Sequence, residues 1–264
     1  MTASPSLVAF AASPTAPVGS DGLADSVALQ PPDGRGTPLW VRPRGAAAAA
    51  GPDALIALLE RHRDAIETAL TEHGAVVFRG CGVADATTFQ RAAEVLAPNL
   101  ADEYLGTTPR AAIAGKVKTA TELGGIYLVP PHLELSFLPT TPRRLFFACF
   151  QPADQGGETT LCDFRAVARD MDAAVRARFE QRGLRLVRNY DGPRTRLGFD
   201  PQKTKRWDEM FETEDRDAIV AKAADNGLEA SWQPNDRLRL VCRQPAFRAH
   251  PVTGQPVWFN HLTV

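Results

Sequence analysis

The chain has 264 residues, of which 44% are hydrophobic and 23% charged, and its 30 basic and 31 acidic residues leave a net charge of -1. A chain of this size and composition can bury a substantial core, so a single globular domain is expected. Neither sign of charge forms a long block, which argues against a nucleic-acid partner and against binding to an anionic membrane surface. No apolar run approaches the ~20 residues that a membrane span needs.

The first 35 residues are rich in Ser, Pro, Ala and Gly and follow no period. We therefore expect a flexible N-terminal segment over 1–35 and one domain over 36–264. No Lys or Arg precedes the short apolar patch near the N-terminus, so no signal peptide is predicted. The wide spacing of the cysteines indicates reduced thiols of a cytoplasmic protein, and the four are Cys81, Cys149, Cys162 and Cys242.

Regular structure is expected to begin with a short strand in TPLWVRP, residues 37–43. The tract GAAAAAGP, residues 45–52, ends in Gly-Pro and is interpreted as a linker or a frayed first turn. Apolar residues then recur at helical spacing between a cap at Asp53 and a stop at Gly74, which predicts one amphipathic helix. His62 lies on its apolar stripe and is interpreted as a packed residue at the edge of the core.

A buried strand in GAVVFRG, residues 74–80, and a helix in DATTFQRAAEVLAP, capped by Asp85 and ended at Pro98, follow in order. From Lys116 onward the pattern changes to short β segments, interrupted by two helical insertions. The β segments are 116–123, 132–137, 144–150, 158–163, 183–190, 228–234, 237–247 and 256–260, and the insertions are 163–183 and 208–227. Many short strands with a few outside helices predict a mainly β barrel or sandwich with flanking helices.

The segment HLELSF carries the most informative pair of residues. In a strand, His132 and Glu134 point to the same face while Leu133 and Leu135 point to the other. An imidazole and a carboxylate on one wall supply two thirds of a 2-His-1-carboxylate triad, which binds Fe(II) and leaves coordination positions open. The alternative is a His and a Glu that simply share a hydrogen bond, because such triplets also arise by chance.

The stretch TATELGGIYLVPPHLELSF, with the later PRRLFFACFQPADQGGETTLCDFRAV, resembles the taurine dioxygenase-like (TauD/TfdA-type) family of Fe(II)/2-oxoglutarate oxygenases. Within that family it is most similar to amino-acid hydroxylases of peptide natural-product biosynthesis. The motifs HGAVVFRG, WDEMFETEDR and HPVTGQPVWFN occur in family order, so the resemblance covers residues 41–264. It implies a double-stranded β-helix (jelly-roll, cupin-like) core with flanking helices, and it implies Fe(II), 2-oxoglutarate and dioxygen as cofactors.

The resemblance assigns roles to individual residues. His132 and Glu134 match the first two iron ligands, and Thr159, in GGET, matches the threonine whose hydroxyl helps to bind a carboxylate of 2-oxoglutarate. Thr159 can equally be an ordinary strand residue after a Gly-Gly turn. Related halogenases have a small residue in place of the acid, so Glu134 implies hydroxylation or another oxidation without halogen.

The family's third ligand is a histidine near the C-terminus, followed by an arginine that pairs with 2-oxoglutarate. His250 is followed by 14 residues without Arg or Lys, and His261 by three, so both are poor candidates. The chain therefore ends before the distal ligand and before the last strands of the barrel. Three interpretations stay open: a longer protein, strands from another subunit, or a member that binds no iron. We expect this chain alone to be inactive and the longer protein to be an oxygenase.

The resemblance implies a small amino-acid-like substrate, free or tethered to a carrier protein, oxidised at an unactivated C–H bond in secondary metabolism. Thr121, Ser136 and Asn260 are the polar positions expected to face the substrate. The alternative for Thr121 and Ser136 is that they are strand residues satisfied by their neighbours. Arg143 and Arg144 are interpreted as a solvated rim. The alternatives are a catalytically incomplete oxygenase fold that acts as a binding or assembly module, and a cupin-like metalloenzyme that uses no oxo-acid.

Overall fold

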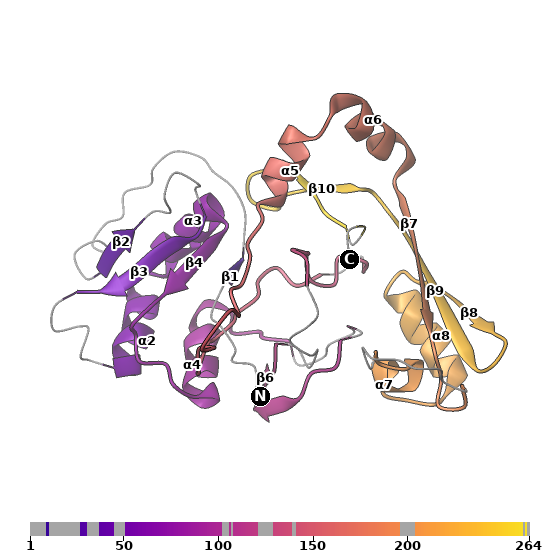
Figure 1. The fold of residues 1–264 in the computed structure, drawn as a ribbon, viewed down its shortest axis with the longest axis horizontal. Coiled ribbons are helices and arrows are strands. Elements are labelled where there is room, and N and C mark those ends of the chain that lie inside the picture. The colour runs from indigo at the N-terminus through magenta and orange to yellow at the C-terminus, as the bar shows by residue number, and fades with distance from the viewer. Residues whose placement is uncertain are drawn as a thin grey trace.

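The computed structural model of the protein describes residues 9–10, 27–30, 37–44, 51–101, 106, 108–120, 129–138, 141–195, 204–260 and 262. One group of elements comes from the N-terminal part and another from the C-terminal part, with α5 (Phe164–Asp170) and α6 (Ala173–Arg182) between them (Figure 1). Within these ranges, no helix combines the length and the apolar character that crossing a membrane requires.

The N-terminal group is built on a four-stranded sheet with the order β1-β4-β3-β2. Strands β3 and β4 run parallel, and both lie where the sequence predicts strands; the other two pairings are antiparallel. A parallel pair needs a crossover connection, which the helices between β3 and β4 supply. The strands are β1 (Ala9–Phe10), β2 (Val27–Gln30), β3 (Leu39–Pro43) and β4 (Ala75–Phe78), so β1 and β2 come from the segment expected to be irregular.

The predicted single helix before β4 is instead two helices, α2 (Gly51–Arg61) and α3 (Arg63–His73). The backbone of His62 leaves helical geometry, with φ -113° and ψ 26°, and no side-chain cap is present there. The predicted end of the helix at Gly74 is confirmed, because Gly74 adopts the left-handed conformation and donates its N–H to the carbonyl oxygen of Leu70. The apolar stripe still reaches the core, with Leu55, Leu59, Ile66 and Leu70 buried against Val41 and Val76.

Helix α4 (Ala86–Leu96) matches its prediction closely. The Asp85 carboxylate accepts hydrogen bonds from the backbone N–H of Thr88 at 2.9 Å and from its hydroxyl at 2.7 Å, so two donors of the first turn are satisfied. The helix ends before Pro98. Its buried face consists of Ala86, Phe89, Ala92, Ala93 and Leu96.

A small hairpin follows α4, formed by β5 (Ala112–Ala114) and β6 (Val117–Lys118). The side-chain oxygen of Gln90, on α4, accepts a hydrogen bond from the backbone N–H of Lys116 at the hairpin turn, at 2.9 Å. The hairpin is thereby fixed to the helix that precedes it.

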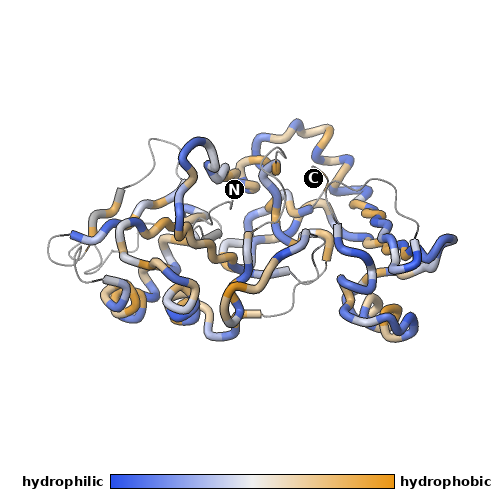
Figure 2. Tube along the Cα trace, turned by 60° about the horizontal axis from the view of Figure 1, so that its bottom comes forward, coloured by the Kyte–Doolittle hydropathy of each residue, from blue (hydrophilic) through white to orange (hydrophobic). Residues whose placement is uncertain are grey.

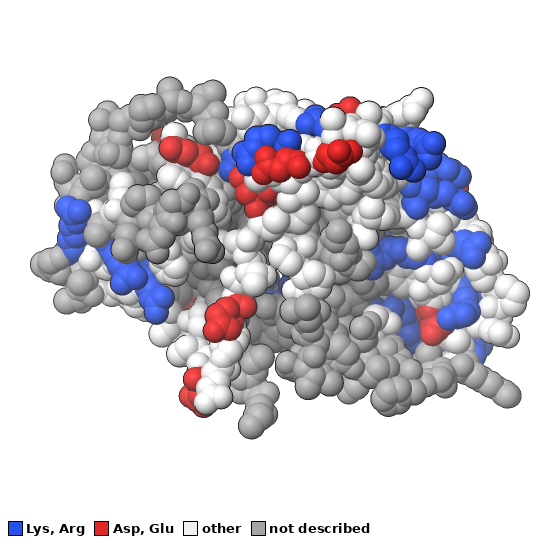
Figure 3. Space-filling model, turned by 45° about the horizontal axis from the view of Figure 1, so that its top comes forward, with Lys and Arg blue, Asp and Glu red and all other residues white. Residues whose placement is uncertain are grey.

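The C-terminal group is built on a three-stranded antiparallel sheet, β7-β9-β8, whose three strands were all predicted. They are β7 (Leu184–Tyr190), β8 (Glu229–Gln233) and β9 (Arg237–Gln244). Residues of β9 alternate between the two faces: Leu238 and Leu240 are buried, whereas Arg237, Arg239 and Arg243 are exposed. Basic side chains gather toward this end of the molecule in Figure 3.

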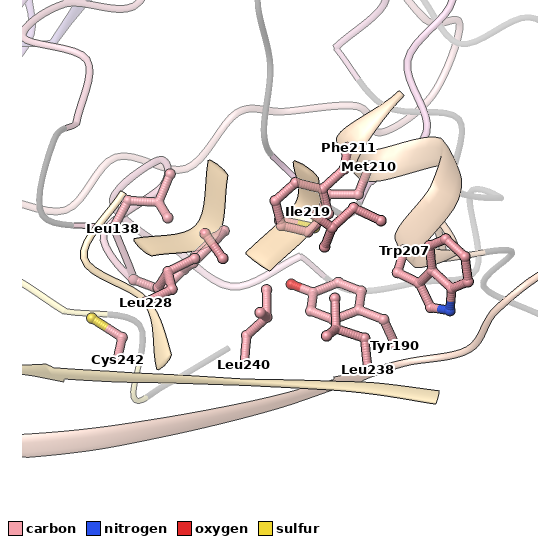
Figure 4. Close-up of a cluster of buried hydrophobic side chains, with 12 residues drawn as sticks. Leu138, Tyr190, Trp207, Met210, Phe211, Ile219, Leu228, Leu238, Leu240 and Cys242 are labelled. Atoms are coloured by element: carbon pink, nitrogen blue, oxygen red, sulfur yellow. The ribbon is translucent and has the colours of Figure 1, made fainter. Parts of the chain in front are cut away.

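Helices α7 (Trp207–Phe211) and α8 (Arg216–Asp225) contribute to the core of this group. Trp207 from α7 and Ile219 from α8 are almost fully buried with Leu238 and Tyr190 from the sheet (Figure 4). Along helices elsewhere in the chain, the tube in Figure 2 changes repeatedly between hydrophobic and hydrophilic colours.

Aromatic packing joins α6 to the C-terminal hairpin of β10 (Phe247–Ala249) and β11 (Pro256–Trp258). The Trp258 ring meets Phe179 of α6 edge to face, with centroids 4.8 Å apart, and Phe247 at 5.1 Å. Such pairs stabilise beyond the area that they bury.

Within the described residues the strands form four separate sheets and no closed barrel, so the jelly-roll core stays a prediction. Segments 132–137, 144–150 and 158–163 were predicted as strands and contain none. An apolar or alternating pattern predicts a strand from side chains alone, whereas a strand also needs a neighbouring backbone with which to pair.

Candidate functional site

Glu134 lies in a turn and His132 lies just before that turn, and neither residue is on a strand. Pro130 and Pro131 immediately before them lack the N–H groups that a sheet requires. The turn is closed by the N–H of Ser136, which donates to the carbonyl of Leu133 at 3.2 Å, and Leu135 has a positive φ of 53°. Strand alternation therefore does not bring the two side chains together; the turn does.

Nε2 of His132 lies 3.7 Å from Oε2 of Glu134. The two side chains retain 29% and 13% of their exposure, so the pair sits at a largely desolvated position that solvent still reaches on the histidine side. A separation of 3.7 Å is longer than a normal hydrogen bond, so the two atoms lie close together as a nitrogen and an oxygen that a metal ion could share.

The other ring nitrogen of His132 fixes the orientation of the imidazole. Nδ1 lies 2.9 Å from the carbonyl oxygen of Pro130, and because a carbonyl only accepts, Nδ1 must carry the proton. In the neutral ring this leaves the lone pair on Nε2, facing Glu134. The interaction with the Glu134 carboxylate raises the pKa of His132 above its ordinary value, against the lowering effect of burial. A backbone carbonyl in this position is the usual outer partner of a metal-binding histidine.

Arg110 is a third charged member of the site. Its Nη2 lies 3.3 Å from Oε2 of Glu134, the same oxygen that faces His132. The guanidinium retains 18% of its exposure, so this is a largely desolvated ion pair. Sequence reasoning missed Arg110, because nothing in the spacing of the chain connects it with a carboxylate 24 positions away.

Thr159 lies in an exposed stretch that covers 151–160, after Gly156 and Gly157, which both have positive φ. Thr159 itself is exposed. Its assignment to 2-oxoglutarate therefore stays a prediction.

The three residues predicted to face the substrate are placed differently from one another. Thr121 lies outside the described residues. Ser136 is fully buried, and its carbonyl oxygen accepts a hydrogen bond from Nε2 of Gln244 at 2.7 Å. Asn260 is also buried; its amide donates to the carbonyl of Ala246 at 3.1 Å and accepts from the N–H of Leu262. Their roles toward a substrate stay predictions.

His250 organises a turn. Its Nδ1 accepts hydrogen bonds from the N–H groups of Val252 and Thr253, at 3.3 and 3.1 Å. Burial, together with the charge of Arg165, lowers the pKa of His250, which favours the neutral ring that these contacts require. His261 lies outside the described residues.

Arg143 is exposed, as a rim residue would be, but Arg144 is not a solvated rim residue. Arg144 donates to Glu67 on α3 at 2.6 Å and to the carbonyl of Leu96 on α4 at 2.9 Å. It thus ties the stretch after the site to two N-terminal helices. The prediction failed because a charge before an apolar run shows nothing of a partner 77 residues away.

A cavity of about 230 Å³ lies elsewhere, between α2 and β3, and none of its lining residues belongs to the turn. Its walls are mostly apolar, and burial raises the pKa of the Cys81 thiol at one side of it to about 11, so that thiol is protonated and unreactive at neutral pH. The cavity therefore adds nothing to the site at His132.

The donor set fits a metal ion in part. His132 and Glu134 present one nitrogen and one oxygen of the kinds that Fe(II) accepts. Within the described ranges, no group of three or more His, Cys, Asp and Glu side chains is arranged to hold a metal. The part of the chain that the structure describes thus offers two candidate ligands, and their role toward a metal stays a prediction.

A family model described as "Taurine catabolism dioxygenase TauD, TfdA family" matches residues 41–264. The chain is 31% identical over 197 residues to a dapdiamide synthesis protein from Enterobacter agglomerans, an alignment that covers 75% of this chain and 57% of the relative. It is 28% identical over 204 residues to a clavaminate synthase-like protein from Arabidopsis thaliana, covering 75% of this chain and 60% of the relative. The chain thus spans less than two thirds of the length of each of these relatives.

Proposed function

Because the chain belongs to the TauD, TfdA family of dioxygenases, we propose that the protein is an Fe(II)- and 2-oxoglutarate-dependent dioxygenase. Enzymes of this family use Fe(II), 2-oxoglutarate and dioxygen, and the family implies a cupin-like β fold. The reaction proposed here is the hydroxylation of an unactivated C–H bond in a small amino-acid-like substrate, free or tethered to a carrier protein.

One observation carries the proposal. Within the family match, Nε2 of His132 and Oε2 of Glu134 lie 3.7 Å apart, and the Nδ1 contact with Pro130 leaves Nε2 able to bind a cation. A pair that merely shared a hydrogen bond would not need the imidazole to be held in this tautomer by a second contact.

His132 and Glu134 would hold the metal, and Thr159 would donate its hydroxyl to a carboxylate of 2-oxoglutarate. When bound, iron and 2-oxoglutarate supply the oxidising power: dioxygen and the oxo-acid are consumed, the substrate gains a hydroxyl group, and succinate and CO2 leave. The protein's own contribution is to orient the ligands and to keep the Glu134 oxygen in a largely desolvated position, where its attraction for a cation is less screened than in water.

The substrate class is the finer part of the proposal. One relative is named for dapdiamide synthesis and another for its likeness to clavaminate synthase, which supports a role in the synthesis of a small natural product. Thr121, Ser136 and Asn260 stay candidate substrate contacts. All four cysteines are free thiols, which supports a cytoplasmic setting for the reaction.

The test is anaerobic addition of Fe(II) and 2-oxoglutarate in excess to the full-length protein, with the visible charge-transfer band of the chelate as the readout. We expect the band with the wild-type protein and its loss in His132→Ala. His73→Ala is the matched control, since His73 lies at the end of α3, away from the turn. Thr159→Ala should raise the 2-oxoglutarate concentration that gives the band. A band that survives His132→Ala would place the chelate elsewhere.

The second candidate is a catalytically incomplete oxygenase fold that acts as a binding or assembly module. The observation in its favour is that the described residues contain no third metal-ligating group beside His132 and Glu134. Absence of any band in the wild-type protein would make this the leading function. An unchanged 2-oxoglutarate requirement in Thr159→Ala would instead favour a cupin-like metalloenzyme that uses no oxo-acid.

A further inference from the structure

The side chains of Arg110 and His132 both approach one oxygen atom of Glu134. Oε2 lies 3.3 Å from Nη2 of Arg110 and 3.7 Å from Nε2 of His132. If Glu134 is the metal ligand of the proposed function, on which this inference rests, Arg110 already contacts the atom that a metal ion would need.

The contact with Arg110 compensates the charge of a largely buried carboxylate. The Glu134 side chain retains only 13% of its exposure, and an ionised carboxylate at such a position is costly unless a positive charge compensates it. A bound divalent cation would supply that charge, and Arg110 supplies it in the structure described here.

Arg110 is held in place independently of Glu134. The next residue, Ala111, donates its N–H to the Thr119 hydroxyl at 2.9 Å, and the N–H of Thr119 donates to the Ala111 carbonyl at 2.8 Å. These bonds close the base of the β5–β6 hairpin, which Gln90 ties to α4. The backbone of Arg110 is therefore anchored, while its long side chain can still change direction.

We propose that Arg110 is a positioning residue that holds the Glu134 carboxylate beside His132 and, through its positive charge, opposes the binding of a cation at Oε2. It holds the carboxylate beside His132, so the two proposed ligands stay close to each other. Arg110 therefore competes with a metal ion for Glu134, because a guanidinium and a divalent cation repel each other when both approach the same oxygen. The site is thus ordered without metal but binds metal more weakly than the same two ligands would alone.

The test measures Mn(II) binding, with the electron paramagnetic resonance signal of free Mn(II) as the readout, so it does not depend on turnover. Arg110→Gln removes the charge and keeps a hydrogen-bond donor, and we expect Mn(II) affinity to rise about tenfold. Arg110→Lys keeps the charge and should stay near the wild-type affinity. Arg144→Gln is the matched control: it breaks another partly buried Arg–Glu pair, with Glu67, and should leave Mn(II) binding unchanged.

Equal or weaker Mn(II) binding in Arg110→Gln than in the wild type would overturn the assignment and leave the proposed metal site intact. Failure of both proteins to bind Mn(II) would overturn the metal site itself, and the inference with it. Arg110→Met is a second neutral variant of similar length. If both neutral variants fail to fold while Arg110→Lys folds, the ion pair is a structural tie and the assignment is wrong.

Discussion

The Gln244 amide donates to the carbonyl oxygen of Ser136 at 2.7 Å, across 108 positions of sequence, and thereby joins β9 to the turn that carries His132 and Glu134. Arg248 extends the connection, because Nη2 donates both to the carbonyl of Leu138 and to Oε1 of Gln244, each at 2.9 Å. The candidate site is thus attached to the C-terminal sheet through buried polar contacts and not only through apolar packing.

Replacing Gln244 with Leu should lower the free energy of unfolding by about 1–3 kcal/mol, because the Ser136 carbonyl loses its buried donor. Urea unfolding measures the change. Gln233→Leu is the control: the Gln233 amide donates to Ser231 and Trp232 of its own strand, so a small effect is expected. Equal losses in the two variants would contradict a special role for the Gln244 contact.

Two neighbours on α8 test the core shown in Figure 4. Ile219 is 0% exposed and Val220 is 39% exposed. Ile219→Ala should cost about 2–5 kcal/mol of unfolding free energy, since it leaves a cavity among packed side chains. Val220→Ala should change it by less than about 0.5 kcal/mol. Similar values for both, measured by urea unfolding, would mean that α8 does not pack on the sheet through this face.

Gly192 has a steric reason to be glycine. A Cβ there would collide with the indole nitrogen of Trp207 and with the carbonyl oxygen of Asp236, which already hydrogen-bond to each other at 2.8 Å. Gly192→Ala should therefore lower the thermal midpoint clearly, with a cost of about 1–3 kcal/mol or more. Gly80→Ala is the contrast, because its Cβ would meet nothing within 4 Å and only its φ of +78° opposes the change. The loss of stability should be smaller in Gly80→Ala than in Gly192→Ala. A larger loss in Gly80→Ala would refute the collision at Gly192.

His250 should make stability depend on pH. Burial, with the charge of Arg165 added, lowers the pKa of His250 in the folded protein, whereas the unfolded chain keeps a value of about 6.5. The unfolded state therefore binds the proton more readily, so stability is full above about pH 6.5 and falls as the pH drops toward the folded pKa. The dependence of the unfolding free energy on pH should be weaker in His250→Asn, whose side chain can still accept hydrogen bonds from the N–H groups of the turn.

Unfolding free energies of wild type and His250→Asn at about pH 7.5 and about pH 5.5 measure this effect. His132 has a raised pKa and acts in the opposite direction, but it is present in both proteins and cancels in the comparison. Identical pH slopes for the two proteins would show that His250 does not titrate differently on folding.

Local signals in the sequence predicted much of the fold. Asp85 and the apolar spacing up to Leu96 identified α4, and alternation identified β7 and β9, because caps and periodicity are properties of neighbouring residues. The break at His62 was not predicted, since the apolar stripe continues unchanged through it. Strand β1 was not predicted either: it pairs with β4 across more than 60 positions.

The sequence predicted the residue types of the candidate site but not their arrangement. The residue types of His132 and Glu134 indicated a metal pair, but their arrangement on a turn follows from Pro130, Pro131 and the left-handed backbone of Leu135, which a period-two pattern does not register. The approach of Arg110 depends on how a separate hairpin packs, and no local rule contains that information.

The C-terminal sheet also constrains the order in which the molecule can fold. Strand β9 is central, and it is joined to β8 by the Asn235–Asp236 turn, whose residues both have a φ of 61°. This hairpin closes a very short loop, whereas β7 can pair with β9 only after the chain that contains α7 and α8 has been brought round. Loop closure across a longer span loses more entropy before any contact is gained, so the hairpin is the natural nucleus and β7 is added to an existing edge.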